Sequence, residues 1–340
     1  MDKTTLTVLE LICENSRNVA ARVAEKLNVS RQAASARLSR LKKEGLIISK
    51  GSGRSTFYYL AELRGVSAEY QREGLEEDFV WRKQCVQFLA NLPDNVRGIW
   101  HHGITEMVNN AIDHSNAETV LVTLRETALQ TYCTVHDNGE GIFAKIQRAL
   151  NLYDERESIL ELSKGKLTTD PANHSGEGIF FSSKMFDRFL IDSGSLSFVH
   201  LGNDVPDVLL SITNPVNGTS VTMILDNDSK RTTQEVFNTF ALPDEFAFAK
   251  TIVPVKLAQH EGEKLVSRSQ AKRLTRRFER FQIVILDFDG VGEIGQGFAD
   301  EVFRVFAKSH PKLRMHPINT SPAVAKMIKR VTAEDGTQSD

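Results

Sequence analysis

The sequence predicts a multidomain protein of the mixed α/β class, and three observations support that prediction. The chain has 340 residues, more than the about 100–200 residues of an ordinary single domain. Residues 1–60 contain eleven Lys or Arg and five Asp or Glu, a net charge of +6, whereas the whole chain carries −2. Segments with the apolar spacing of helices also alternate with short apolar runs typical of strands. A hydrophobic fraction of 41% excludes a wholly disordered chain.

The basic N-terminal segment predicts three helices followed by a hairpin. Apolar residues recur at helical spacing in two stretches, the second running from Val19 to Leu27. Ser30 is placed to cap a third helix, which ends at Gly45, a residue type that favours helix C-termini. The segment LIISKGSGRSTFYYL then alternates apolar and polar residues around a Gly-Ser-Gly tip, which predicts two antiparallel strands. This order resembles a winged helix-turn-helix domain, expected at residues 1–62.

The resemblance implies that this domain binds double-stranded DNA. In winged helices the helix after the turn enters the major groove, and the hairpin touches the backbone or the minor groove. The residues that would contact DNA are Arg31, Gln32, Ser35 and Arg37 on the third helix and Arg54 on the hairpin. The charge of +6 fits a polyanionic partner. The alternative is that these side chains form a solvated helix face and that the domain binds another protein.

Residues 63–98 are polar and charged, with scattered apolar positions such as Tyr70, Phe79 and Trp81. Helices that connect the basic domain to the next one are the simplest interpretation, and Pro93 predicts a break near their end. We therefore expect a helical linker over this segment.

The next segment predicts a helix with a polar face. Helical spacing places Glu106, Asn110 and Asp113 on one side, opposite an apolar face. A carboxylate and a carboxamide placed in this way can orient a water molecule and ligate a hard cation. Three nearby histidines fit packing or capping better than a zinc site; they are His101, His102 and His114.

Three further motifs contain glycines. Asp137 closes a predicted strand and is followed by Gly139 and Gly141, which allow a ligand to approach the backbone closely. Gly176 and Gly178 enter an apolar helical run, and backbone N–H groups at a helix N-terminus can bind phosphate. The last motif, Asn217-Gly218-Thr219, leads into a strand.

In their order, E-x-x-x-N-A, D-x-G-x-G, G-x-G and G-T, these motifs resemble the ATP-binding domain shared by gyrase B, the heat-shock chaperone of that class, histidine kinases and the mismatch-repair ATPase. This is the GHKL or Bergerat fold, expected at residues 99–228, and it implies an α/β sandwich that holds ATP between helices and a mixed sheet. The resemblance assigns Mg²⁺ ligation to Asn110, an adenine contact to Asp137 supported by Thr219, the base pocket to Gly139 and Gly141, and the lid over the phosphates to Gly176 and Gly178.

The resemblance also bears on the chemistry, through Glu106. ATPases and anti-sigma serine kinases of this family have Glu at that position as general base, whereas histidine kinases usually have Asn or His. Glu106 therefore favours ATP hydrolysis or transfer to a hydroxyl over histidine phosphorylation. Residues 143–175 are expected to form the lid, in which Lys164 and Lys166 either reach a phosphate or lie on a solvated surface.

The C-terminal third predicts a further small α/β domain at residues 250–333. A basic helix (Ser267–Phe281) precedes the continuous apolar strand Ile283–Phe288, after which helix, strand and helix follow. The stretch DFDGVGEIGQGFADE resembles a STAS-like domain, of the kind found beside such ATPases in bacteria. Phospho-regulated STAS proteins carry a Ser where this chain has Gly295-Gln296-Gly297, which favours a docking or dimerising role. The basic helix either touches DNA or is solvated.

Together the motifs favour a cytoplasmic, dimeric transcriptional regulator of a bacterial type that binds ATP and Mg²⁺, hydrolyses ATP slowly and couples nucleotide state to DNA binding. The alternatives are a serine/threonine kinase of the anti-sigma type acting on a separate regulatory protein, and a nucleotide-binding scaffold without turnover. The STAS-like domain offers a surface for a protein partner. Scattered cysteines, no apolar run near the about 20 residues of a membrane helix and no signal-peptide pattern predict a reducing cytosol and no membrane contact.

Overall fold

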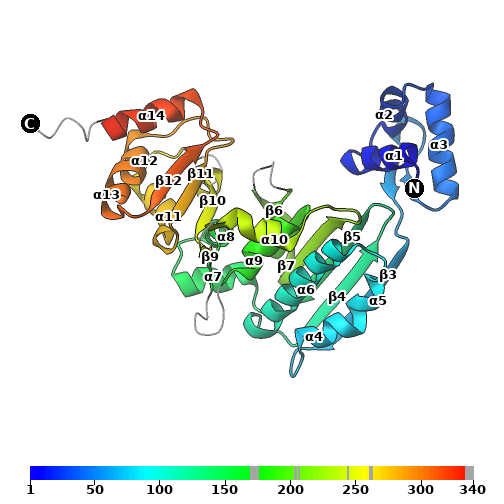
Figure 1. Ribbon diagram of the computed structural model, residues 1–340, viewed down its shortest axis with the longest axis horizontal. Coiled ribbons are helices and arrows are strands. Elements are labelled where there is room, and N and C mark those ends of the chain that lie inside the picture. The colour runs from blue at the N-terminus through cyan, green and yellow to red at the C-terminus, as the bar shows by residue number, and fades with distance from the viewer. Residues whose placement is uncertain (169–175, 203–204, 206, 243–244, 260–262, 334–340) are drawn as a thin grey trace, which may run out of the picture.

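The computed structural model of the 340-residue chain describes all residues except 169–175, 203–204, 206, 243–244, 260–262 and 334–340, and of Arg54 and residues 245–247 it describes only the backbone. Figure 1 shows a helical N-terminal domain at one end, a small C-terminal domain at the other and a larger domain with a broad sheet between them. Among the described residues, every helix is too short or too polar to cross a bilayer.

The N-terminal domain has the elements that the sequence predicts. They are α1 (Lys3–Glu14), α2 (Val19–Lys26), α3 (Arg31–Lys43), β1 (Ile47–Lys50) and β2 (Phe57–Leu60). Ser30 Oγ accepts a hydrogen bond from the Ala33 N–H at 3.1 Å and so caps α3. Gly45, with φ of +74°, ends the same helix in the left-handed region that glycine tolerates. The strands β1 and β2 pair antiparallel, with Lys50 opposite Phe57.

The central domain contains a five-stranded sheet in the order β3-β4-β5-β7-β6, in which all neighbouring strands are antiparallel. The strands are β3 (Arg64–Gln71), β4 (Thr119–Glu126), β5 (Gln130–Asp137), β6 (Arg188–His200) and β7 (Val208–Asp226). Alternate residues of β4, namely Val120, Val122 and Leu124, are fully buried, while Leu121 and Thr123 on the opposite face are only half-buried. One face of the sheet therefore carries the core.

Helices cover that core face (Figure 1). They are α4 (Glu77–Val80), a π-helix (Trp81–Cys85), α5 (Val86–Phe88), α6 (Asp94–His114), α7 (Ile142–Leu150), α8 (Arg156–Lys164), α9 (Gly178–Met185) and α10 (Thr233–Phe240). Gly103 allows the long helix α6 to lie close to Phe186, since a Cβ at this position would be 2.4 Å from the Phe186 ring. Trp100 and Ile104 of α6 are fully buried.

The prediction of a helical linker at residues 63–98 is wrong for its first part. Residues 64–71 form β3, which pairs with β4 from Arg64 opposite Glu126 to Gln71 opposite Thr119. The helical remainder packs into the domain core, where Val80, Cys85 and Leu89 are fully buried. The strand was missed because β3 is an edge strand with mostly exposed side chains, so it lacks the apolar alternation of a half-buried strand.

The C-terminal domain contains a three-stranded parallel sheet in the order β10-β11-β12. Its elements are β10 (Lys250–Pro254), a 3-10 helix (Val255–Ala258), α11 (Arg268–Thr275), a 3-10 helix (Phe278–Arg280), β11 (Ile283–Asp287), α12 (Gln296–Asp300), a π-helix (Glu301–Phe306), α13 (Ala307–Ser309), β12 (Arg314–Ile318) and α14 (Pro322–Ala333). The predicted apolar strand is β11, the central strand, whose Val284 and Leu286 are fully buried. A short hairpin, β8 (Ala241–Leu242) and β9 (Glu245–Phe248), precedes the domain.

The apolar cores divide the chain unevenly. One core runs without interruption through the central and C-terminal domains, and includes Leu160 of α8 together with Val253 of β10 and Phe278. The N-terminal domain has its own core, against which Ala128 and Leu129 of the β4–β5 turn pack. The chain therefore contains two packing units rather than three.

Candidate functional site

Helix α6, the end of β5 and the interior of β7 enclose one side of a cavity of about 320 Å³ in the central domain. Met107 and Ala111 anchor α6 in the core, which turns Glu106 and Asn110, one helical turn apart, toward the cavity. The other side is formed by α7, the end of α8 and the start of α9. Seven of the eight residues that the sequence assigned to this site line the cavity; they are Glu106, Asn110, Asp137, Gly141, Gly176, Gly178 and Thr219.

The cavity has a polar and an apolar part. Its apolar walls come from several elements and are formed by Met107, Val135, Ile142, Ile146, Leu162, Leu167, Ile179 and Val221. The polar side chains belong to Glu106, Asn109, Asn110, His114, Ser115, Asp137, Lys145, Thr168 and Thr219. Apolar walls with a few converging polar groups are the usual composition of a small-molecule site.

Asp137 is buried at the end of β5, directly opposite Thr219 of β7. Its Oδ1 accepts a hydrogen bond from the Gly139 N–H at 2.9 Å. Burial raises the pKa of this carboxyl, and hydrogen bonds from the backbone of Gly139 and Thr219 act in the opposite direction. The Thr219 hydroxyl accepts a hydrogen bond from the Ile142 N–H at 3.0 Å and so fixes the start of α7. The pair therefore presents a rigid acceptor to an N–H donor in the cavity.

Gly141 and Gly139 differ in role. Gly141 lines the cavity with φ of +85°, and a Cβ there would lie 2.7 Å from Ser193 Oγ. The expectation that Gly139 also lines it is not met, because Gly139 packs against the end of α6, where a Cβ would lie 2.0 Å from the Ser115 carbonyl oxygen. Gly139 thus allows the turn after β5 to approach α6.

The third motif brings the start of α9 next to Glu106. Gly178 is the first residue of α9, and a Cβ there would lie 1.9 Å from Glu106 Oε2. The carboxylate therefore lies against the positive end of the helix, where anionic groups are stabilised. Gly176, with φ of +73°, accepts a hydrogen bond from the Leu167 N–H at 3.0 Å, which ties the start of α9 to the segment after α8.

The polar end of the cavity can hold a hydrated cation together with a ligand. The Asn110 side-chain Nδ2 is buried and has no hydrogen-bond partner among the described residues. This amide group therefore has unmet capacity to donate a hydrogen bond to a ligand in the cavity, and the oxygen of a carboxamide is a possible cation ligand. No cluster of three or more His, Cys, Asp or Glu that could hold a metal occurs among the described residues. Mg²⁺ fits such a site, because it is usually held by one or two side chains together with phosphate oxygens.

The three histidines near α6 lie in different surroundings. His101 stacks edge-on against Trp81, with ring centroids 4.7 Å apart. His102 lies beside Phe237, and burial lowers its pKa to about 4. His114 lines the cavity.

Neither alternative for Lys164 holds, a phosphate contact or a solvated surface, and Lys166 is half-buried; both side chains contact the C-terminal domain and do not line the cavity. Lys164 is fully buried, and its Nζ lies 2.7 Å from Glu161 Oε1. The Nζ of Lys166 donates to the Arg280 carbonyl oxygen at 3.1 Å.

Among the described residues, the lysine that lines the cavity is Lys145, which the sequence motifs did not single out. Its spacing was informative, since it follows Gly141 by four residues and so lies one turn into the next helix.

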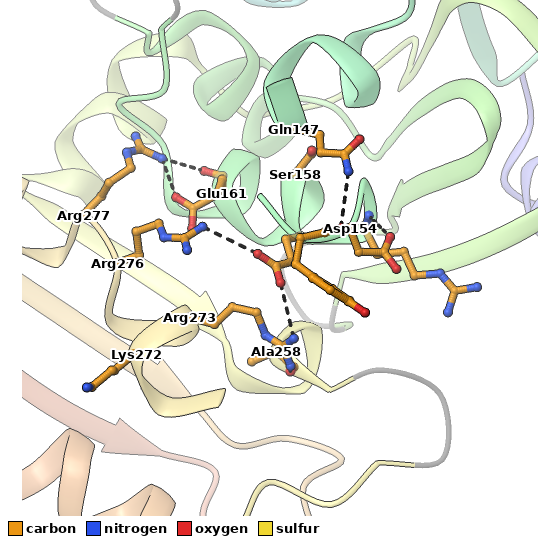
Figure 2. Close-up of polar contacts among 12 residues, drawn as sticks. Gln147, Asp154, Ser158, Glu161, Ala258, Lys272, Arg273, Arg276 and Arg277 are labelled. Carbon is orange, nitrogen blue, oxygen red and sulfur yellow. Dashed lines mark hydrogen bonds and ion pairs between the residues drawn. The ribbon is translucent and has the colours of Figure 1, made fainter. Parts of the chain in front are cut away.

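Figure 2 shows that the C-terminal part of the predicted basic helix is not turned outward, because Arg273, Arg276 and Arg277 point toward the central domain. The helix itself, α11, ends at Thr275, and Arg276 just after it remains exposed. The Arg277 guanidinium lies 2.9 Å from Glu161 Oε2, and that of Arg273 lies 3.5 Å from Glu157 Oε1. The prediction that these arginines touch DNA or water is therefore wrong for Arg273 and Arg277.

The predicted STAS acceptor position has no room for a side chain. A Cβ at Gly295 would lie 2.8 Å from the Val266 Cα, so glycine is required by close packing there. This agrees with the missing serine in the sequence.

The N-terminal domain exposes most of the residues assigned to DNA. Arg31, Gln32 and Ser35 are exposed on α3, whereas Arg37 is half-buried. Arg54 belongs to a short 3-10 turn (Gly53–Ser55) between β1 and β2, and its side chain lies outside the described part of the chain. The sequence analysis did not single out Ser39, Arg40 and Lys43, which are also exposed on α3.

Three known families match separate parts of the chain. Residues 1–48 match winged helix-turn-helix DNA-binding domains, residues 95–229 match the histidine kinase-, DNA gyrase B-, and HSP90-like ATPase family, and residues 270–325 match a STAS-like domain of unknown function. A search of curated proteins found no match. The three predicted resemblances and the multidomain α/β fold class are thereby confirmed.

Proposed function

We propose that this chain, which joins a winged helix-turn-helix domain, a GHKL ATP-binding domain and a STAS-like domain, is an ATP-responsive transcriptional regulator. One observation carries the proposal: residues from four separate sequence motifs line a single cavity. The same chain exposes polar and basic side chains on α3, the second helix of its helix-turn-helix.

The cavity supports ATP as the ligand. The buried Asp137 carboxylate is placed to accept a hydrogen bond from the adenine amino group, and Val135, Ile142 and Val221 provide apolar contact for the base. The triphosphate then extends toward Asn110 and the start of α9, where the helix N-terminus favours negative charge. Bound Mg²⁺ neutralises phosphate charge at that end, and Asn110 is the side chain proposed to hold it.

Glu106 is the residue proposed for slow hydrolysis. It lies at the polar end of the cavity, one helical turn before Asn110, where a carboxylate can orient a water molecule and accept its proton. Such turnover resets the nucleotide state of a regulator.

The regulation follows from linkage. ATP changes DNA binding only if it has different affinities for two arrangements of the chain, and DNA must discriminate between the same arrangements. We propose that the protein acts in the cytoplasm as a homodimer on double-stranded DNA, and that its STAS-like domain provides the surface for a regulatory protein.

The test is selection of DNA from a pool of randomised duplexes by the full chain, followed by binding measurements with and without Mg·ATP. We expect a change in DNA affinity of about 5-fold or more, which is the lower end of allosteric coupling. The Asp137→Ala variant should bind the same DNA with no response to ATP. Equal affinities for the wild-type chain in both conditions would contradict the coupling. Transfer of radiolabelled γ-phosphate to a separate protein, lost in Glu106→Gln, would instead favour the kinase alternative.

A further inference from the structure

Helix α8 and the residues after it belong to two domains at once. Leu162, Leu167 and Thr168 line the nucleotide cavity. All of α8 from Glu157 to Lys164 is buried, because the C-terminal domain covers the side that faces away from the cavity. A shift of this segment would therefore change the cavity wall and the domain contact together.

Two buried carboxylates of α8 meet three arginines of the C-terminal domain (Figure 2). Glu157 lies 3.5 Å from both Arg273 and Arg276. Glu161, which is 1% exposed, lies 2.9 Å from Arg277. Buried charges are tolerated only when they are paired and hydrogen-bonded, so these contacts define how α8 and the C-terminal domain can dock.

Arg277 makes more contacts with this segment than the other two arginines. One guanidinium nitrogen donates to the Glu161 carboxylate and, at 3.3 Å, to the Glu161 carbonyl oxygen. The second terminal nitrogen, Nη2, donates to the Gly165 carbonyl oxygen at 2.8 Å and to the Lys166 carbonyl oxygen. These carbonyls belong to the last turn of α8 and the residues just after it, where a helix leaves its carbonyl groups unpaired. A planar fork with several donors suits such a cluster, and a lysine ammonium cannot reproduce it.

The backbone on both sides of this contact is strained. Arg277 has φ of +67° and Lys166 has φ of +49°, although neither is glycine. Long side chains rarely adopt this region, and such residues persist where the surrounding structure holds them, often at functional sites. Here one left-handed residue from each domain is joined to the other by a hydrogen bond.

We propose that Arg277 is a positioning residue of the nucleotide site, supplied by the STAS-like domain. It holds residues 161–166, and through them it fixes the cavity wall formed by Leu162, Leu167 and Thr168. This inference rests on the proposed nucleotide site. Because linkage is reciprocal, nucleotide in the cavity also stabilises the docking of the STAS-like domain on α8.

The test compares Arg277→Lys with Arg276→Lys in the full chain. Both variants keep the charge, but only the first loses the fork to the carbonyl groups; Arg276 is exposed, and its guanidinium pairs with Glu157. Calorimetric titration with Mg·ATP should show an affinity about 10-fold lower for Arg277→Lys, within the usual range of coupling, and unchanged for Arg276→Lys. Equal affinities for Arg277→Lys and the wild-type chain would overturn the proposal.

Hydrogen exchange separates positioning from a merely structural role. In the wild-type chain, saturating Mg·ATP should slow exchange in α6 and also in α11. In Arg277→Lys, saturating Mg·ATP should still protect α6 but no longer α11. Protection of α11 to the same degree in both proteins, or in neither while α6 is protected, would contradict the proposal.

Two controls keep the outcomes distinct. If the wild-type chain does not bind Mg·ATP, the proposed function fails, whereas wild-type binding with unchanged Arg277→Lys binding refutes this inference alone. If Arg277→Lys does not fold, Arg280→Met replaces it, because Arg280 is exposed and donates to the same Lys166 carbonyl oxygen at 2.9 Å. That variant should lower affinity about 3-fold, a smaller share of the same coupling, and unchanged affinity would overturn the proposal.

Discussion

The two terminal domains are attached to the ATP-binding domain in different ways. The STAS-like domain shares an apolar core with it and is joined by ion pairs whose carboxylates are buried. The winged helix has a separate core, against which Ala128 and Leu129 of the β4–β5 turn pack, and its Cys13 thiol contacts Gln130 Oε1 at the start of β5 at 3.9 Å. On the proposed function, a nucleotide in the cavity would therefore act on the STAS-like domain through α8, and on the winged helix through the sheet or through assembly of the protein.

The connection to the winged helix passes through an edge strand. The Leu63 N–H donates to the Glu126 carbonyl oxygen at 2.8 Å, and Arg64 pairs with the Glu126 carboxylate. β3 then continues along β4, whose neighbour β5 ends at Asp137. The sheet thus provides a short path of hydrogen-bonded strands from Asp137 in the cavity to the end of the winged helix-turn-helix domain.

The largest expected effect tests the buried side of this comparison. Glu161→Gln leaves Arg277 and Lys164 without their buried counter-charge, so we expect a loss of about 3–5 kcal/mol in the free energy of unfolding. Urea unfolding followed by the fluorescence of Trp81 and Trp100, both in the ATP-binding domain, measures it, and far-UV circular dichroism follows the winged helix, which has no tryptophan. The matched control is Glu14→Gln, which breaks an exposed pair with Arg22 in the winged helix and should cost less than about 1 kcal/mol. Equal losses in the two variants would show that the two attachments do not differ.

The second prediction concerns pH. Burial lowers the pKa of His102 to about 4 from its usual 6.5, so the unfolded chain binds more protons between pH 6.5 and 4. The stability of the ATP-binding domain is therefore complete above pH 6.5 and falls on acidification, by up to about 3 kcal/mol from this group. Tryptophan fluorescence melts at several pH values measure it, and His102→Gln should show a flatter profile. The winged helix contains no histidine, so its unfolding should lack this component.

The third prediction addresses the cavity. Asp137→Ala removes a buried charged acceptor, and hydrogen bonds to such groups contribute about 1.5–3 kcal/mol. Affinity for Mg·ATP should therefore fall by about 10- to 100-fold in calorimetric titration. Glu118→Ala is the control next to the same loop, because Glu118 is exposed, does not line the cavity and contacts Asn138 of that loop only through its backbone N–H. Undiminished affinity in Asp137→Ala would overturn the assignment of the site.

The smallest expected effect lies in the winged helix. Arg31→Ala combined with Arg54→Ala should weaken DNA binding by about 1 kcal/mol and reduce the slope of log affinity against log salt by about 1–2. Fluorescence anisotropy with a selected duplex at several salt concentrations measures both. An unchanged slope would show that neither residue contacts phosphate. The ATP affinity of the same variant should not change, since the winged helix has a core separate from that of the ATP-binding domain.

Elements whose form depends on residues close together in the chain could be predicted from the sequence. The Ser30 cap, the Gly45 end of α3, the buried strand β11 and the order of the four ATP-site motifs were all readable from nearby residues. The cavity was predictable for the same reason, because each motif carries its own backbone requirement.

Contacts between distant segments were not predictable in this way. The pairing of β3 with β4 joins residues about 50 positions apart, and an edge strand gives little apolar signal. Lys164 and Arg277 are residue types typical of solvated surfaces, and the docking of the C-terminal domain on α8 buries them. Charge alone does not show whether a basic residue faces water, DNA or a buried carboxylate.

The complete burial of α8 also limits how this architecture can change between relatives. A shortened chain that ended after α10 would expose Ile159 and Leu160 to water and leave Glu157 and Glu161 without partners. The ATP-binding and STAS-like domains must therefore be inherited as one piece. The winged helix-turn-helix domain has its own core, so it can be exchanged for another domain at the start of β3. New target sequences can then be acquired while the proposed nucleotide-sensing part stays the same.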